Sequence, residues 1–162
     1  MRGLTRVAWL LVALGAVWVG AIVFAPIGIA SPSGAARVCA LATYAAGSFV
    51  CHQIPARSFH LAGQPFAVCG RCTGLYMSAL AGGLAALVMW RRLPIADRWL
   101  LAMAAVPTAL SWTLEHAGVA AQSNVLRAAA ALPLGFAGAW VVIGLLVEKR
   151  KTPSSYKLPS AV

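Results

Sequence analysis

Long apolar runs alternate with short polar segments along the whole chain. A bilayer's hydrocarbon core is about 30 Å thick, which takes roughly 20 helical residues to cross. Runs of about this length extend from Leu4 to about Phe24, from Cys72 to Trp90, from Trp99 to about Ala117 and from about Val125 to Val147. The pattern therefore predicts an all-α fold, a polytopic membrane helix bundle of about four transmembrane helices.

A shorter apolar segment, from Ala36 to Val50, lies between the first two runs and is barely long enough to span. We interpret it as a short re-entrant or interfacial helix. If it does cross the bilayer, the chain has five crossings and its N-terminus lies outside. The first run is longer than the usual hydrophobic core of a cleaved signal, so we expect it to be an uncleaved anchor that ends at Pro26.

The composition supports lipid as the surrounding solvent. Of 162 residues, 61% are hydrophobic and 10% are charged, whereas charged residues make up roughly 25% of soluble domains. This length predicts a single integral membrane domain, residues 1–151, with an outer Cys/His loop over 51–72. Residues 152–162 are polar and proline-containing, which predicts a disordered cytoplasmic tail.

The net charge of +10 marks one side of the membrane rather than a nucleic-acid surface. With four crossings and the N-terminus inside, nine of the 13 basic residues lie in cytoplasmic segments and four lie outside, whereas five crossings give eight against five. Both topologies place the Cys/His loop outside and the C-terminus in the cytoplasm. We therefore expect a multi-pass protein of a bacterial or archaeal cell (inner) membrane, with the lipid bilayer as its partner and no nucleic acid.

Polar side chains at membrane depth are costly, so their positions carry information. In the four-crossing topology they gather near the outer ends of the helices. We expect Glu115 to form an ion pair with Arg127 there. The other residues of this polar cluster are Thr73, Tyr76, His116, Ser123 and Asn124.

The loop itself carries three short motifs: Cys51-His52-Gln53, then Pro55-Ala56-Arg57-Ser58-Phe59, then Cys69-Gly70-Arg71-Cys72-Thr73-Gly74-Leu75-Tyr76. This arrangement resembles the domain of unknown function 2085 family of small prokaryotic integral membrane proteins. The resemblance covers roughly Cys51 to Arg127, and the chain departs from the pattern at Ser111-Trp112, where we expect an acidic residue. The resemblance implies a membrane location and no established activity. Any inference about function, including whether the protein is an enzyme, must therefore come from its residues.

The first hypothesis is a metal site. Cys69 and Cys72 have the spacing with which two thiolates share a tetrahedral ion. Cys51, with either His52 or His60, would complete four ligands. Zinc is the expected metal, and the soft sulfur ligands also suit copper(I) or iron.

The second hypothesis is thiol redox chemistry. Cys72 lies at a helix N-terminus beside Arg71, and both the helix dipole and the cation favour the thiolate. The layout is similar to that of quinone-linked disulfide-generating membrane oxidases, with a quinone as the cofactor. In an oxidising compartment the cysteines would alternatively staple the loop as disulfides. Cys39 is expected to be a buried small hydrophobe, with pairing to Cys51 as the alternative.

The third hypothesis rests on the cations. The side chains of Arg57, Arg71, Arg127, His52 and His60 would form a basic outer pocket for a phosphate or a lipid headgroup. Ser58 and Thr73 would donate hydroxyl hydrogen bonds to the ligand. The sequence has no phosphatase or transferase motif and no inverted repeat of the kind found in transporters.

Overall fold

The computed structural model describes residues 2–89, 97–119 and 123–148. The predicted tail over 152–162 lies outside the described residues, as do the basic pairs and runs at 91–92 and 149–151. The described chain forms the α-helices α1 (Arg2–Ala30), α2 (Gly34–Ser48), α3 (Gly70–Met89), α4 (Asp97–His116) and α5 (Asn124–Glu148). Between α2 and α3 lie a 3-10 helix (Pro55–Arg57) and the strands β1 (His60–Leu61) and β2 (Gln64–Pro65). The prediction of an all-α membrane bundle is confirmed.

Three of the described helices are long and apolar enough to cross a membrane: Thr5–Ala30 in α1, Gly70–Met89 in α3 and Asn124–Val147 in α5. α4 is also 20 residues long but is not one of these three. Its run is interrupted by Pro107, Thr108, Ser111, Thr113 and Glu115, which lower its mean hydropathy. Four crossings therefore stay a prediction.

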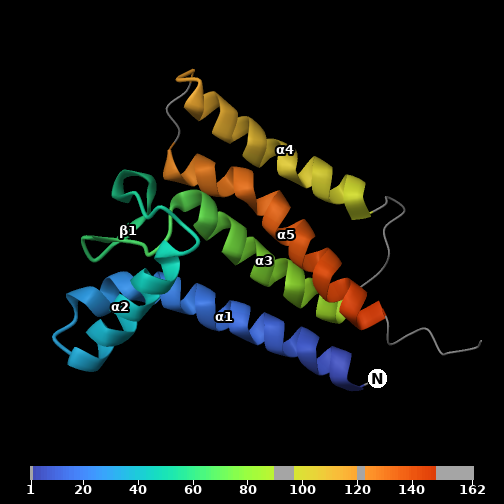
Figure 1. The fold of residues 1–162 in the computed structure, drawn as a ribbon, viewed down its shortest axis with the longest axis horizontal. Coiled ribbons are helices and arrows are strands. Elements are labelled where there is room, and N and C mark those ends of the chain that lie inside the picture. The colour runs from blue at the N-terminus through green and yellow to red at the C-terminus, as the bar shows by residue number, and fades with distance from the viewer. Residues whose placement is uncertain (1, 90–96, 120–122, 149–162) are drawn as a thin grey trace, which may run out of the picture.

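α3 and α5 form the centre of the bundle because glycines let their backbones touch (Figure 1). A Cβ added at Gly70 would lie 2.8 Å from the Asn124 carbonyl oxygen, and one at Gly74 would collide with the backbone of Ala128. A Cβ at Gly82 would collide with the backbone of Phe136 in the same way, so Gly70, Gly74 and Gly82 share the face of α3 that packs on α5.

α1 is longer than expected and continues through Pro26 to Ala30. The prediction that the helix stops at Pro26 is wrong. Pro26 is fully buried, and the turn around it packs against α2, where Gly28 lies against Ala36 and Ala40. That packing offsets the hydrogen bond that the proline removes. α2 has 15 residues and an N-cap in which the Ser33 side chain accepts from the Ala36 amide; it lies beside the end of α1 (Figure 1).

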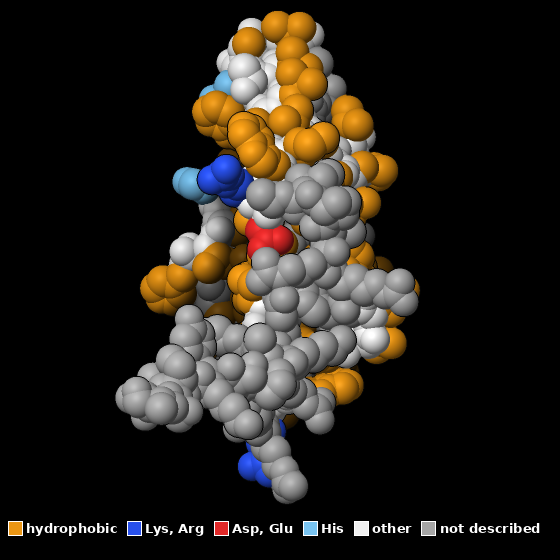
Figure 2. Space-filling model, turned by 90° about the vertical axis from the view of Figure 1, so that its right-hand side faces the viewer, with side chains coloured by type: hydrophobic (Ala, Val, Ile, Leu, Met, Phe, Trp, Pro, Cys, Tyr) orange, Lys and Arg blue, Asp and Glu red, His pale blue; other side chains and the backbone are white. Residues whose placement is uncertain are grey.

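α4 packs against α5 on the side away from α1 (Figure 1), and the Thr108 hydroxyl donates to the Ala130 carbonyl at 2.8 Å. The other side of α4 carries an exposed apolar stripe at Trp99, Met103, Val106 and Leu110. Figure 2 shows hydrophobic side chains over the upper part of the molecule, where α4 lies. A helix face of this kind suits contact with lipid.

The segment between α2 and α3 lies at the end of the bundle where α1 ends and where α3 and α5 begin (Figure 1). β1 and β2 pair antiparallel, with His60 opposite Pro65. The two-residue turn at Ala62 and Gly63 has positive φ angles of 53° and 76°, as a type I′ hairpin turn requires. The fold thus gathers the loop and the first turns of two central helices at one end.

Candidate functional site

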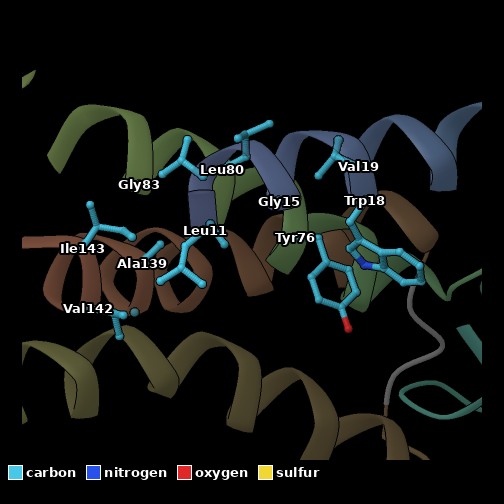
Figure 3. A pocket seen from close by; sticks show the side chains of 13 residues that line it. Leu11, Gly15, Trp18, Val19, Tyr76, Leu80, Gly83, Ala139, Val142 and Ile143 are labelled. Carbon is cyan, nitrogen blue, oxygen red and sulfur yellow. The ribbon is translucent and has the colours of Figure 1, made fainter. Parts of the chain in front are cut away.

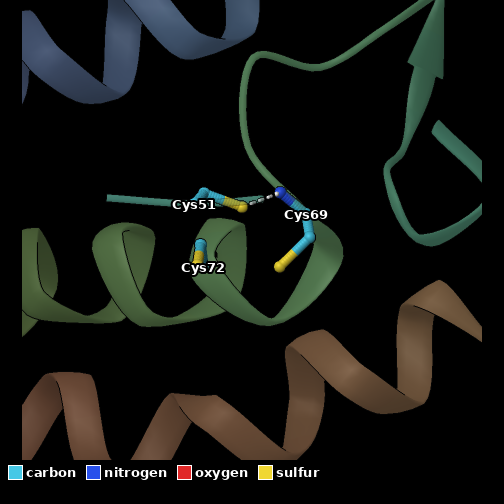
Figure 4. A group of neighbouring side chains, drawn as sticks. All are labelled: Cys51, Cys69 and Cys72. Atoms are coloured by element: carbon cyan, nitrogen blue, oxygen red, sulfur yellow. Dashed lines mark hydrogen bonds between the residues drawn. The ribbon is translucent and has the colours of Figure 1, made fainter. Parts of the chain in front are cut away.

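Three cysteines meet at this end of the bundle (Figure 4). Cys51 follows α2, Cys69 directly precedes α3, and Cys72 is in the first turn of α3. Their Sγ atoms all lie within 4.8 Å of one another. The Cys51 sulfur also accepts backbone hydrogen bonds, from the Cys69 amide at 3.2 Å and from the Gln53 amide at 3.5 Å. The loop thus brings three sulfur ligands together, and two backbone amides donate to one of them, Cys51.

Gln53 holds the loop in the conformation that forms this triad. Its backbone has a positive φ of 49°, which is uncommon for a residue with a side chain. The Gln53 side-chain amide donates to the carbonyls of Tyr44 at 2.7 Å and Ala67 at 2.8 Å, and the Tyr44 hydroxyl donates to the Pro65 carbonyl. These bonds tie the end of α2 to the segment that leads into Cys69. No role for Gln53 could be assigned from its residue type alone, although its place in the Cys-His-Gln motif was a usable signal.

Cys69 lies before the apolar span of α3, and its surroundings favour the thiolate. A hydrogen bond from the Cys72 thiol, helped by others from the backbone amides of Cys72 and Arg71, lowers the pKa of the Cys69 thiol to about 5 and outweighs the opposing effect of burial. A thiolate is the form that binds metal and that attacks disulfides.

Of the two candidate histidine ligands, neither is a member of the three-residue sulfur group. His52 is exposed and lines the cavity beside the triad. His60 is exposed on β1. Cys39 is also outside the group and lies on the exposed side of α2, so the expectation that it is buried is wrong. All four cysteines are free thiols.

A second cluster is centred on Glu115, whose side chain is only 8% exposed. Arg127 binds both carboxylate oxygens, with Nη2 at 2.8 Å from Oε1 and Nε at 3.3 Å from Oε2. Arg71 Nη2 lies 3.2 Å from Oε2, and Arg57 Nε lies 3.3 Å from Oε1. The predicted pair of Glu115 with Arg127 is confirmed, and two further arginines from the loop and α3 join it.

The remaining polar residues mostly hold the scaffold. Asn124 accepts from Arg127 at 2.7 Å and donates to the Ser58 carbonyl at 2.8 Å, which docks the loop on α5. The Ser58 hydroxyl is buried and donates to the Ile54 carbonyl, and the Thr73 hydroxyl donates to the Cys69 carbonyl. Both hydroxyls are thus engaged with the backbone rather than with a ligand pocket, because each lies within reach of the carbonyl four residues earlier.

The two clusters line a single cavity of about 450 Å³. The sulfur triad lies on one side and the arginines on another. His116 lies at this cavity too and stacks on Trp112, with their ring centroids 4.1 Å apart. In the sequence Trp112 marks only a departure from the family pattern, and nothing there indicates that it lines a cavity. Besides the three cysteines, the cavity is lined by Val50, His52, Gln53, Ile54, Arg57, Arg71, Trp112, His116 and Arg127.

An apolar groove of about 330 Å³ lies on the other side of α3, between α1, α3 and α5 (Figure 3). Gly15, Gly83 and Gly138 keep it open, and Trp18 and Tyr76 lie together near one end with their rings edge to face. Tyr76 is one turn along α3 from Cys72 and packs in the same apolar cluster as the triad. Tyr76 therefore belongs to this groove and does not line the cationic cavity.

Comparison with known proteins adds a family match and two relatives. A family model described as a predicted membrane protein (DUF2085) matches residues 51–141. The uncharacterized protein MJ1492 of Methanocaldococcus jannaschii is 32% identical over 107 residues, 65% of this chain and 69% of the relative. An uncharacterized protein of Methanothermobacter thermautotrophicus is 33% identical over 87 residues, 54% of this chain and 78% of the relative. No solved structure matches. The family match includes both the sulfur triad and the arginine cluster.

Proposed function

The chain belongs to DUF2085, a family of predicted membrane proteins, and from the geometry of its site we propose that it is a membrane metal-binding protein. Cys51, Cys69 and Cys72 supply three thiolate ligands to one ion, with zinc as the metal. The same ligand set also suits copper(I) and iron, which share zinc's affinity for sulfur.

The observation that carries this proposal is the convergence of the three sulfurs. Zinc–sulfur bonds of about 2.3 Å in a tetrahedron place neighbouring sulfurs roughly 3.8 Å apart. The Sγ atoms already lie within 4.8 Å of one another, so small side-chain movements bring them into place. The amide donors to Cys51 and the low pKa of Cys69 favour the deprotonated ligands that a metal requires.

We assign the fourth ligand to His52. It is adjacent to Cys51 and lines the cavity next to the triad. His60 is the alternative, on an exposed strand of the hairpin. With either histidine the protein supplies all four ligands, and only His52 would bring the fourth from the cavity wall.

We propose that the site lies at the outer face of the membrane, in a four-crossing bundle whose C-terminus is cytoplasmic. α1, α3, α4 and α5 run in alternating directions (Figure 1). The apolar stripe of α4 supports its placement against lipid. The excess of basic residues in the segments at the opposite end supports this orientation.

The apolar groove favours a second candidate function, quinone-linked thiol oxidation. A groove lined by small residues that ends at Trp18 and Tyr76, close to Cys72, suits the isoprenoid chain of a membrane quinone. Two thiols would then give one disulfide while the quinone takes up two electrons and two protons to become a quinol. Replacing Cys72 with Ser should abolish such oxidation while the bundle stays inserted, whereas an unchanged rate would eliminate this candidate.

The experiment that separates the two functions measures metal content and free thiols on the same purified protein. Stoichiometric zinc with four reduced thiols supports the metal site. Absence of metal after purification under metal-replete reducing conditions contradicts it. Disulfides that form on addition of a quinone analogue support the second candidate.

A further inference from the structure

We propose that the cavity beside the sulfur triad is a binding site for a phosphate group held by Arg57, Arg71 and Arg127. The site is distinct from the metal centre, although it shares a wall with it. Its ligand would be either free phosphate or the phosphate of an anionic lipid headgroup, because both present the same oxygens to the arginines.

The charges around the cavity do not balance. Three guanidinium groups face one carboxylate, that of Glu115, which leaves two positive charges. Glu115 lies behind these arginines, and no Asp or Glu is among the described residues that line the cavity itself. The side chains of Arg127 and Arg71 are only 10% and 18% exposed, so water compensates little of their charge. A zinc ion with three thiolates carries one negative charge, so the excess is still positive when the proposed metal is bound.

The arginines also have unused hydrogen-bonding capacity. Oε2 of Glu115 accepts from Arg71 and Arg127. Oε1 accepts from Arg127 and lies 3.3 Å from Arg57 Nε as an ion pair. The Arg71 Nε atom is buried, and it has no hydrogen-bond partner among the described residues. Buried donors of this kind are costly unless a ligand or water pairs with them. Both oxygens of the carboxylate are therefore engaged by arginines, while the guanidinium groups still have N–H donors for a further anion.

A phosphate group fits the cavity in both chemistry and size. Planar guanidinium forks match pairs of phosphate oxygens better than any other side chain, and a phosphate monoester has a charge of about −1.5 to −2 at pH 7. The cavity of about 450 Å³ is in the usual range for small-molecule sites. Trp112, which is half exposed, lies at the edge of the cavity with Ile54, so an ester carrying an apolar group also fits.

The position of the cavity suits both sources of the ligand. It is formed where α3 and α5 begin, at the same end of the bundle as the loop (Figure 1). In the proposed orientation this is the level of the outer headgroups, where basic pockets between helices bind anionic lipids. The cavity also opens to the aqueous side through the exposed His52 and His116.

The test measures binding of radiolabelled inorganic phosphate to the full-length protein in detergent. Native mass spectrometry counts bound molecules of phosphatidylglycerol, an anionic lipid. Phosphatidylcholine is the control lipid, because its choline group cancels the charge of its phosphate. The variants are Arg57→Gln and Arg71→Gln. Arg37→Gln is the matched control, since Arg37 is exposed on α2, bonds the Ser31 carbonyl and lies outside the cavity.

We expect Arg57→Gln and Arg71→Gln each to weaken phosphate binding by roughly tenfold or more, because each removes a charge-assisted hydrogen bond. Arg37→Gln should leave phosphate binding unchanged. Saturable binding of inorganic phosphate identifies a free phosphate compound as the ligand. Binding of phosphatidylglycerol alone identifies the lipid headgroup. The proposal is overturned if neither probe binds, or if Arg37→Gln weakens binding as much as Arg57→Gln. Metal content measured on the same samples separates this outcome from failure of the metal site.

Discussion

The backbone amide of Cys69 donates a hydrogen bond of 3.2 Å to the Cys51 sulfur, across 18 residues of sequence. The bond joins the loop that leaves α2 to the residue that starts α3. An amide donor favours the thiolate form of the sulfur that accepts it. The geometry at one end of the loop therefore depends on the geometry at the other, and the loop and a bound ion should form as one unit.

This coupling predicts the effect of removing a ligand. Cys51→Ser, Cys69→Ser and Cys72→Ser should each weaken metal affinity by roughly tenfold or more and make residues 52–68 more accessible to protease, because the bound ion would link the two ends of the loop. Metal analysis and limited proteolysis in detergent would measure both effects. Cys39→Ser is the control, since Cys39 lies outside the triad. Full metal content in all three triad variants would contradict the site.

The fourth ligand can be identified with the two histidines. His52→Ala should reproduce the loss of metal seen in the cysteine variants, because His52 is next to Cys51 and lines the cavity. His60→Ala should retain metal, because its side chain is exposed on β1. Metal content of the two purified variants decides between them. If His60→Ala loses the metal and His52→Ala keeps it, the assignment is reversed.

The orientation of the bundle leads to a labelling prediction. Cys69 and Cys72, reduced and freed of metal, should react with a membrane-impermeant thiol reagent added outside intact cells, because the basic residues favour the opposite side for the other segments. Labelling is read as a mass shift in a Cys39→Ser background, which removes the exposed cysteine of α2. Reaction only after the membrane is broken would reverse the topology.

Much of the fold could be predicted because apolar runs mark helices directly. The starts predicted at Cys72, Trp99 and Val125 lie within two residues of the observed starts of α3, α4 and α5. The continuation of α1 through Pro26 could not be predicted, because it depends on packing against α2. The exposure of Cys39 could not either, because apolar periodicity does not tell a protein-facing side of a helix from one that faces outward.

The candidate site was predictable in its residues and unpredictable in its geometry. The Cys-x-x-Cys spacing and the Cys-His-Gln motif indicated three cysteines that could meet. The positive φ of Gln53, which makes them meet, is set by tertiary hydrogen bonds. Likewise the sequence suggested that Glu115 pairs with Arg127, which lies only 12 residues away on α5. It could not indicate Arg71, which is 44 residues away.

The close crossing of α3 and α5 predicts that alanine is destabilising at Gly74 and tolerated at Gly138. Gly74→Ala should destabilise the bundle by about 1–3 kcal/mol, the usual cost of overpacking, because its Cβ would collide with the backbone of Ala128. Gly138→Ala is the control, because nothing lies within 4 Å of its added Cβ. Thermal unfolding in detergent compares them. Equal midpoints for the two variants would show that α3 and α5 are not in backbone contact there.

The arginine cluster leads to a prediction about Glu115. Glu115→Gln keeps the size of the side chain but removes the charge that three arginines share. We expect a loss of stability of about 1–3 kcal/mol, the value of hydrogen bonds to a charged group near the surface. The cavity then has three uncompensated positive charges, so phosphate should raise the unfolding temperature of this variant more than that of the wild type. Asp97→Asn, the same change at the other end of α4, is the control and should respond to phosphate as the wild type does. If phosphate raises the unfolding temperature of all three proteins equally, the anion acts on the whole molecule and not at the arginines around Glu115.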